Sequence, residues 1–407
     1  MTVRWEKGSK MHVVVIGDVG VVDGMMHIGD EAMFDAMVEA LRARGADAIT
    51  GISSAPEETA SRYGIDAIGR IGFPGTRAEM QERFDAVLAS ADGRAALPPE
   101  DPAWAVLEAV GAADAVVVAG GGNMASNWPM HVFERAALGA IARRLGRPLV
   151  VSGQTLGPRL DAADRELVGG LLRSAQLVGV RELPSARLAS GLGVPSGRLA
   201  ANRDDASFLG LPADALPDAA SPAILVSLSV HLGGLRRDEA VPRLAASLDA
   251  LADRTGLPLA FHPHFGSLRP ATTAGDEVLH EAVRAELRAP SVALRAGDPR
   301  PAASLARGAA MLVTSRYHPA VFAAPAGVPI AALSADDYTA VKLRGATGWW
   351  DQDGVVDLAI AASPAGGEAL ARVWDARAAA RIAAEAARPA AEAASAAWFD
   401  RVVDALS

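Results

Sequence analysis

Residues 115–123 have the sequence Ala-Val-Val-Val-Ala-Gly-Gly-Gly-Asn, a short apolar run that ends directly in three glycines. The run predicts a buried strand, and the glycines predict a turn at which the backbone can lie close to a ligand. Similar apolar runs end in polar residues at 149–154, 177–182 and 311–316. Because helical patterns lie between several of these runs, the sequence predicts mainly parallel sheets with helices on both faces.

The alternation of strands and helices occurs twice, in residues 11–215 and again in residues 222–345. Residues 209–222, rich in Pro, Ala and Asp, separate the two arrays and are typical of a linker. We therefore predict an α/β fold with two Rossmann-like domains that face each other across a cleft. Strands are expected at residues 12–16, 115–119, 149–152, 177–180, 196–201, 223–230, 258–261, 292–294, 311–314 and 329–333.

Two segments do not follow this alternation. Residues 73–105 carry charges and prolines, and we interpret them as an insertion at the edge of the first sheet. Residues 346–407 are expected to form a helical tail that packs back across the first domain. Within this tail, Pro389 is expected to break or kink a helix.

Composition excludes several classes of protein. The 407 residues include 39 Lys and Arg against 48 Asp and Glu, a net charge of −9, which argues against nucleic acid as a partner. The absence of Cys excludes disulfides, thiolate catalysis and Cys-ligated metals. No apolar run approaches the roughly 18–20 residues of a membrane span, and residues 1–10 lack the apolar core of a signal peptide. We expect a cytoplasmic protein without a transmembrane segment.

The glycine-rich strand ends are the first candidate site. The sequence has no G-x-G-x-x-G in a first βα turn and no P-loop motif, which argues against dehydrogenases and P-loop enzymes. In open parallel sheets, ligands bind at the carboxyl ends of the strands. We therefore predict substrate contacts from Gly121, Gly122, Asn123 and Gln154, with glycines that only form tight turns as the equally supported alternative.

The second candidate site is the stretch Thr314-Ser315-Arg316-Tyr317-His318-Pro319, which follows an apolar run and precedes a helical pattern. The guanidinium of Arg316 suits a carboxylate or phosphate, and the imidazole of His318 suits proton transfer near neutral pH. A surface arginine and a packed histidine are the alternative. Lys342, one βα unit later, either adds positive charge to this site or lies on a solvated helix face.

The remaining histidines allow several interpretations. His262 and His264 follow a strand and are expected either to contact a substrate or a diphosphate on it, or to form a structural turn. No third ligand lies near them in the sequence, so no metal is predicted. His12 and His131 have no special context and are interpreted as ordinary residues.

Several of these motifs together resemble the polysaccharide pyruvyltransferase family. The similarity runs through residues 13–345 in the family's order, and six motifs in order are fairly specific. The matching stretches are Gly29-Asp30-Glu31-Ala32, Gly120-Gly121-Gly122-Asn123, Gly153-Gln154-Thr155-Leu156-Gly157-Pro158, Val180-Arg181-Glu182-Leu183-Pro184-Ser185, Asp204-Asp205-Ala206, Ser315-Arg316-Tyr317-His318-Pro319-Ala320-Val321-Phe322-Ala323 and Gly327-Val328-Pro329-Ile330.

This resemblance implies a GT-B-like fold and a reaction that moves a pyruvyl group from phosphoenolpyruvate to two hydroxyls of a sugar, with release of phosphate. It implies that Arg181, Arg316 and His318 occupy donor-binding and catalytic positions, with Lys342 as a further donor contact. The first domain would bind the acceptor and the second the donor. The sequence differs from the family's usual pattern at His27, Tyr317 and Pro319, so the acceptor and the activity can differ too.

The general base for the sugar hydroxyl stays open among Asp30, Glu31 and Asp205. Asp30 is also placed to cap a helix, and Glu31 to interact with the helix dipole. Asp30 is, in addition, a candidate substrate contact. The expected partners are phosphoenolpyruvate and a sugar or lipid-linked glycan acceptor, with no cofactor and with a homo-oligomer as an open option. The alternatives are a GT-B-type glycosyltransferase that uses a nucleotide sugar, and a non-enzymatic partner in glycan assembly.

Overall fold

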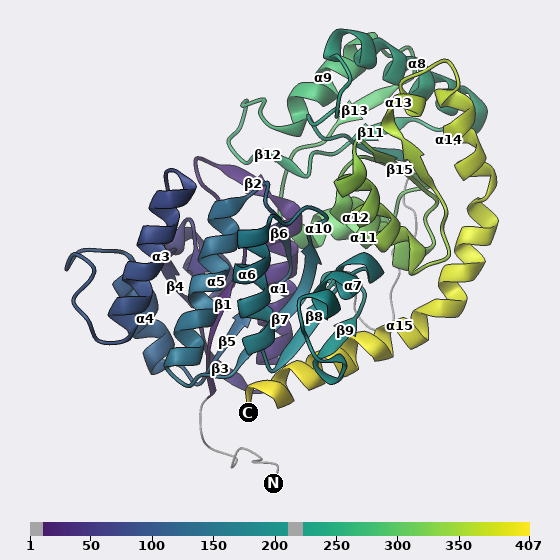
Figure 1. Ribbon diagram of the computed structural model, residues 1–407. Coiled ribbons are helices and arrows are strands. Elements are labelled where there is room, and N and C mark those ends of the chain that lie inside the picture. Colours follow the sequence, from purple (N-terminus) through teal and green to yellow (C-terminus); the bar gives the residue numbers. More distant parts are fainter. Residues whose placement is uncertain (1–10, 211–222) are drawn as a thin grey trace. The chain divides into compact units, whose positions relative to one another are not determined.

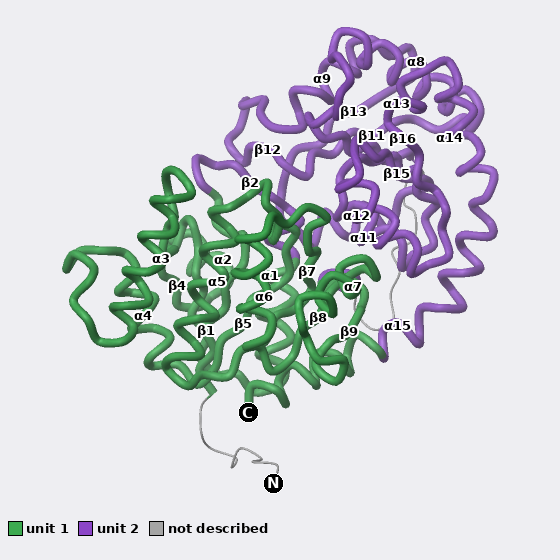
Figure 2. Tube along the Cα trace, in the orientation of Figure 1, with its two compact units in different colours: residues 1–21, 33–205, 394–407 green, residues 22–32, 206–393 purple. Residues whose placement is uncertain are grey.

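The computed structural model describes residues 11–210 and 223–407, so the first ten residues and most of the predicted linker lie outside the described residues (Figure 1). The chain divides into two compact units, coloured green and purple in Figure 2. Among the described residues, unit 1 comprises 11–21, 33–205 and 394–407. Unit 2 comprises 22–32, 206–210 and 223–393.

Unit 1 is built on a parallel sheet, in which the strands at residues 115–118 and 177–180 are apolar and buried. Alternate residues of one strand point to opposite faces, so Val14 and Ile16 join one core cluster while Val13 and Val15 join another. In spatial order the described strands are β4 (Asp66–Gly69), β3 (Ala46–Ser53), β1 (Met11–Ile16), β5 (Ala115–Val118), β7 (Leu149–Leu156), β8 (Leu177–Val180) and β9 (Leu199–Ala201), with β6 (Gly121–Met124) paired to the end of β7.

Helices cover both faces of this sheet (Figure 1). They are α1 (Ile28–Arg42), α2 (Pro56–Tyr63), α3 (Arg77–Ala91), α4 (Ala103–Ala112), α5 (Pro129–Arg144), α6 (Ala162–Ser174) and α7 (Leu183–Gly191), with the 3-10 turn η1 (Ser196–Arg198) before β9. The segment 73–105, interpreted from the sequence as an insertion at the sheet edge, contributes residues to the core. Met80 and Val87 of α3 are buried in the same cluster as β1, because α3 packs against α5.

Unit 2 is likewise built on a parallel sheet with helices around it. Its described strands lie in the order β13 (Ser291–Ala293), β11 (Leu259–Phe261), β10 (Ile224–Ser227), β14 (Met311–Thr314), β15 (Ile330–Ser334) and β16 (Val355–Asp357). The helices are α8 (Arg237–Thr255), α9 (Asp276–Glu286), α10 (Pro299–Arg307), α11 (Tyr317–Ala323), α12 (Asp337–Gly348), α13 (Leu358–Ala361) and α14 (Gly366–Asp375), with the 3-10 turn η2 (Ala324–Ala326) after α11.

A short segment from the start of the chain belongs to unit 2. β2 (Met25–His27) pairs antiparallel with β12 (Phe265–Ser267), and Ile28 N donates to the His264 carbonyl at 3.0 Å. These hydrogen bonds place residues 22–32, with the first turn of α1, in unit 2 rather than in the first domain as the sequence suggested. The pairing joins segments far apart in the chain, so sequence periodicity gave no sign of it.

The tail is a single long helix, α15 (Arg377–Leu406), which continues through Pro389, so the predicted break does not occur. It does not form a separate tail domain, because residues up to 393 belong to unit 2 and residues 394–407 to unit 1. Trp398, Phe399 and Val402 are buried in the unit 1 core, which confirms that the tail packs back on the first domain. None of the helices among the described residues has the length and apolarity needed to cross a bilayer.

Candidate functional site

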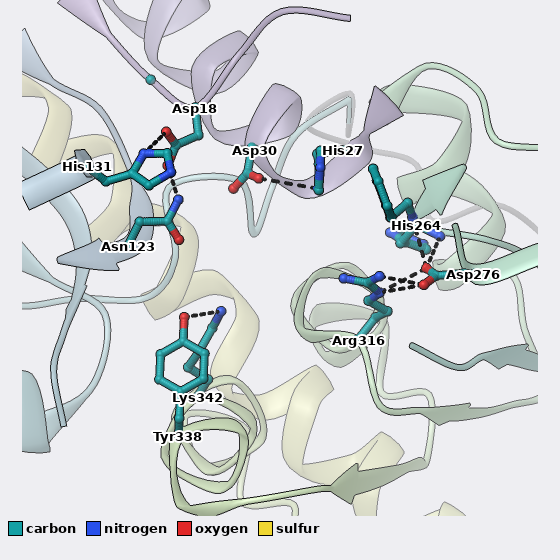
Figure 3. Close-up of polar contacts among 12 residues, drawn as sticks. Asp18, His27, Asp30, Asn123, His131, His264, Asp276, Arg316, Tyr338 and Lys342 are labelled. Carbon is teal, nitrogen blue, oxygen red and sulfur yellow. Dashed lines mark hydrogen bonds and ion pairs between the residues drawn. The ribbon is translucent and has the colours of Figure 1, made fainter. Parts of the chain in front are cut away.

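Arg316 of unit 2 is held by a buried carboxylate. It caps the N-terminus of α11 directly after β14, and its backbone N–H is bonded to Thr314 Oγ1 at 2.9 Å. Its Nε lies 2.9 and 3.1 Å from the two carboxylate oxygens of Asp276, and Nη2 also contacts this carboxylate (Figure 3). The Asp276 side chain is fully buried, whereas the Arg316 side chain is 26% exposed. Asp276 therefore fixes the orientation of a guanidinium that still reaches solvent.

His318 lies two residues further on, half-buried in the first turn of α11. Its imidazole packs directly on Gly29, where a Cβ atom would lie only 1.7 Å from His318 Nδ1. Only glycine leaves room for the ring at this distance. The Gly29-Asp30-Glu31 motif and the Arg316–His318 motif therefore meet within unit 2.

Three further histidines of unit 2 surround this pair and are buried: His262, His264 and His280. Burial lowers the pKa of His262 and of His280 to about 4, and burial together with neighbouring cationic groups holds the pKa of His264 well below its usual range. His280 Nε2 accepts a hydrogen bond from Leu228 N at 2.9 Å, as a neutral ring does. These histidines are neutral at physiological pH.

The predicted acceptor contacts His262 and His264 are each only 4% exposed. His264 is tied into the fold by its backbone, because its N–H is bonded to Asp276 Oδ2 at 3.2 Å. Among residues 11–210 and 223–407, no group of three or more His, Asp or Glu side chains is arranged to hold a metal ion. A direct acceptor contact by these two rings stays a prediction.

The other predicted residues of unit 2 lie near its surface. Lys342 Nζ hydrogen-bonds Tyr338 Oη at 3.1 Å (Figure 3). It also lies 5.2 Å from the ring centre of Tyr317, so both tyrosines support the ammonium group. His27 stacks on Phe265 with ring centres 4.0 Å apart.

The carboxylates of the Gly29-Asp30-Glu31 motif differ in exposure. Asp30 lies 3.9 Å from His27 Nδ1, with its side chain 27% exposed. Glu31, in contrast, is buried, at 2% exposure. Of the two candidate bases in this motif, only Asp30 therefore reaches solvent.

Arg181, in unit 1, is buried in an internal ion pair. It follows β8, and its Nη1 lies 2.7 Å from Asp204 Oδ2 while Nε donates to Thr155 Oγ1 at 2.8 Å. Both side chains of the pair are 1% exposed. These contacts tie Arg181, at the end of β8, to Thr155 of β7 and to Asp204. A direct donor contact, and the convergence of Arg181 and Arg316 on one crevice, stay predictions.

The glycines of the first candidate site have clear structural partners. The side chain of Gln154 is buried below Gly121, where an added Cβ atom would lie 3.3 Å from Gln154 Oε1. Gln154 Nε2 also donates to the Ala119 carbonyl. Gly122 is buried beside it in β6, whereas Asn123 is half-buried and donates to Asp18 (Figure 3). Of Gly121, Gly122, Asn123 and Gln154, only Asn123 is partly exposed.

Sequence reasoning missed the cluster around Asp18. Asp18 lies just after β1, and its carboxylate contacts Arg70, His131 and Arg135 as well as Asn123. His131, which has no special context in the sequence, lies on α5 with its Nδ1 3.0 Å from Asp18 Oδ1. The position of Asp18 at a strand end was the available signal.

A buried carboxylate in unit 1 makes stability depend on pH. Burial, with a smaller contribution from the charge of Asp204, raises the pKa of Asp205 to about 7, against the hydrogen bond that Ser152 donates at 2.7 Å and the charge of Arg181. Trp398 Nε1 in turn donates to Ser152 Oγ at 2.9 Å, which links the C-terminal helix to this carboxyl.

We expect Asp205→Asn to remove part of this pH dependence. A carboxyl whose pKa is raised by folding stabilises the protein fully below its unfolded pKa of about 4, and this contribution is lost as pH rises through about 7. The wild type should therefore lose up to about 4 kcal/mol relative to the variant between pH 4 and pH 8. Urea unfolding at both pH values measures this, and an equal difference between the two proteins at pH 4 and pH 8 would contradict it.

Most of the chain matches one known protein family. The family model for polysaccharide pyruvyl transferase matches residues 27–337, from the last residue of β2 to the first residue of α12. The chain belongs to this family. The matched region includes Arg181 of unit 1 and Arg316 and His318 of unit 2, so residues of both units contribute to the family match. No curated protein sequence was found to be similar to the chain.

Solved structures place the fold of this pyruvyl transferase family member in the GT-B class. The glycosyltransferase of kitacinnamycin is 14% identical with a TM-score of 0.59, covering 98% of this chain and 100% of its own. The calicheamicin glycosyltransferase is 18% identical with a TM-score of 0.56, covering 98% of each chain. The UDP-GlcNAc 2-epimerase from Neisseria meningitidis is 14% identical with a TM-score of 0.57, covering 92% of this chain and 94% of its own. These likenesses confirm the predicted α/β, GT-B-like fold.

Proposed function

We propose that this protein transfers the pyruvyl group of phosphoenolpyruvate to two hydroxyls of a sugar in a polysaccharide or glycan precursor, forming a pyruvate ketal. The observation that carries the proposal is the packing of His318 on Gly29 beside the oriented Arg316. Two motifs that resemble those of the family, distant in the sequence, here form one group of an anion-binding side chain and a proton-transferring side chain.

The donor carries a phosphate and a carboxylate, and a chain of net charge −9 must supply cations locally. Arg316 presents a guanidinium that is 26% exposed and fixed by Asp276. Lys342, half-buried over the rings of Tyr317 and Tyr338, is the second cation of unit 2 in the proposal. Arg181, which the resemblance assigns to the donor site, serves as a positioning residue while it is paired with Asp204.

The reaction needs an acid for the donor. His318 protonates C3 of phosphoenolpyruvate, which forms the methyl group and makes C2 electrophilic. The oxygen of a sugar hydroxyl then forms a bond to C2 while its proton passes to solvent, and the bond from C2 to the phosphate oxygen breaks. The second hydroxyl closes the ketal and gives its proton to the released phosphate. Arg316 stabilises the negative charge that develops on the leaving group.

A comparison of ligands tests the donor. Phosphoenolpyruvate at about 100 times its Kd should stabilise the protein by roughly 2.7 kcal/mol and raise the thermal midpoint, whereas UDP-N-acetylglucosamine should not. The same protein should release inorganic phosphate from phosphoenolpyruvate when sugars with free diols are added. The GT-B fold is the observation that favours the second candidate, a nucleotide-sugar glycosyltransferase. A shift with the nucleotide sugar alone would replace the proposal by that candidate.

A further inference from the structure

His264 of unit 2 is held in place by its backbone, next to the guanidinium of Arg316 (Figure 3). Its N–H donates to Asp276 Oδ2 at 3.2 Å, and the same oxygen lies 2.9 Å from Arg316 Nε. Its carbonyl accepts a hydrogen bond from Ile28 N at 3.0 Å. One buried carboxylate therefore fixes both the backbone of His264 and the side chain of Arg316.

The ring of His264 also lies close to His318. The ring centres of His264 and of His318 are each 6.0 Å from that of Phe322, which follows His318 by one turn in α11. His318 packs in turn on Gly29, the residue directly after Ile28. The imidazoles of His264 and His318 are therefore neighbours around one phenyl ring, and all of these residues belong to unit 2.

The ring nitrogens of His264 are not used by the fold. Within residues 11–210 and 223–407, neither Nδ1 nor Nε2 has a hydrogen-bond partner, although the residue is only 4% exposed. His280, which is buried in the same unit, differs because its Nε2 accepts a hydrogen bond from Leu228 N at 2.9 Å. Buried polar groups of folded proteins nearly always have a partner. Two unpartnered nitrogens on one buried ring therefore point to a partner from outside the chain.

His264 can supply a hydrogen bond without adding a charge. Burial, together with the charges of His262, His318 and Arg316, holds the pKa of His264 well below its usual range. The neutral imidazole that results offers one N–H donor and one lone pair. The guanidinium of Arg316, which is 26% exposed, attracts an anion to the same place, and an anionic oxygen is a strong acceptor for an N–H.

We propose that His264 binds the donor: the N–H of its neutral ring donates a hydrogen bond to an anionic oxygen of phosphoenolpyruvate held at Arg316. This inference rests on the proposed function, which assigns the donor to Arg316 and His318 and gives His264 no role. Because no group of the described chain bonds to these ring nitrogens, the donor gains this contact without another being broken. The backbone contacts hold the ring in place before the donor arrives, which lowers the entropy cost of binding.

The test substitutes His264 in the full chain and measures the binding of phosphoenolpyruvate by calorimetry. His264→Phe keeps an aromatic ring beside Phe322 and removes both nitrogens. We expect its Kd to rise about 10- to 100-fold, the usual effect of losing one hydrogen bond to a charged group. The thermal midpoint of the ligand-free variant should stay unchanged or rise, because no hydrogen bond of the fold is lost. His264→Asn and His264→Gln carry an amide N–H close to the positions of Nδ1 and Nε2, and one of them should recover part of the affinity.

His280→Phe is the matched control, since His280 is also a buried histidine of unit 2. This substitution removes the acceptor for Leu228 N, so it should lower the thermal midpoint. The Kd for phosphoenolpyruvate should stay at the wild-type value. The two phenylalanine variants are therefore expected to show opposite patterns of stability and affinity.

An unchanged Kd in His264→Phe overturns the assignment of His264 alone. A lowered thermal midpoint in this variant with no recovered affinity in either amide variant also overturns it, because that pattern belongs to a histidine that the fold requires. If His264→Phe does not fold, long-range ¹H–¹⁵N spectra of the wild type replace it. The ring signals of His264, identified by their loss in His264→Asn, should shift when saturating phosphoenolpyruvate is added, and unshifted signals overturn the assignment. If the wild type neither binds phosphoenolpyruvate nor releases phosphate from it, the proposed function fails, and this inference fails with it.

Discussion

His318→Gln is expected to lower kcat for phosphate release by about 10²- to 10⁴-fold, the usual contribution of a positioned general acid. Glutamine retains hydrogen-bonding groups and a similar size but cannot deliver a proton near neutral pH. The thermal shift with phosphoenolpyruvate should persist, because Arg316 and Lys342 hold the anionic donor in the proposal. Phosphate release under saturating donor measures kcat, and the thermal midpoint of the free variant reports its folding.

Gly29→Ala is expected to lower activity by displacing the His318 ring. An added Cβ atom would lie 1.7 Å from His318 Nδ1, so the imidazole must move. Alanine by itself favours a helix by about 1 kcal/mol over glycine, so a loss of activity in this variant reflects the displaced ring. Gly111→Ala is the matched control, because Gly111 also lies in a helix and an added Cβ atom there has open space.

His231→Gln is the control for the histidine itself, since His231 lies in the same unit but its side chain is 55% exposed and paired with Asp336. It should keep wild-type kcat. If His318→Gln retained more than a tenth of the wild-type kcat while this control behaved as expected, His318 would not be the acid.

Arg316→Ala is expected to lose both stability and donor binding. The substitution leaves the fully buried carboxylate of Asp276 without its charged partner, and breaking a buried ion pair in this way costs about 3–5 kcal/mol. Two backbone donors remain on Asp276, from His264 and Phe265, and they place the expected loss at the lower end, about 3 kcal/mol. Urea unfolding measures this loss. The shift with phosphoenolpyruvate should disappear even at temperatures where the variant is folded.

Arg236→Ala is the matched comparison, because Arg236 forms an ion pair with Asp238 in unit 2 but both side chains are more than half exposed. Its removal should change the free energy of unfolding by less than about 1 kcal/mol. Arg316→Lys separates charge from geometry: a lysine keeps the charge but cannot form the two-oxygen contact with Asp276. Wild-type donor binding in Arg316→Ala would remove Arg316 from the donor site.

Some of the molecule follows from local sequence alone. The apolar runs at 115–118 and 311–314 are fully buried strands, as predicted. These elements depend on which side chains avoid water within a few residues of each other. The strand-end residues Asn123 and Arg316 could be found in the same way, since the end of each apolar run is visible in the sequence.

Which side chains contact the residues at these strand ends depends on the tertiary structure. No local pattern shows that Gly29 makes room for His318, that Asp276 fixes Arg316, or that His131 lies against Asp18. Each partner comes from a different βα unit, so its position depends on strand order and helix packing rather than on neighbours in the chain. The sequence by itself determined the strands and the polar residues at their ends, because the pattern of apolar and polar side chains is local to each element. Which of those residues meet was decided only when the sheets assembled, because hydrogen bonds and ion pairs act over a few ångströms in space, whatever the distance along the chain.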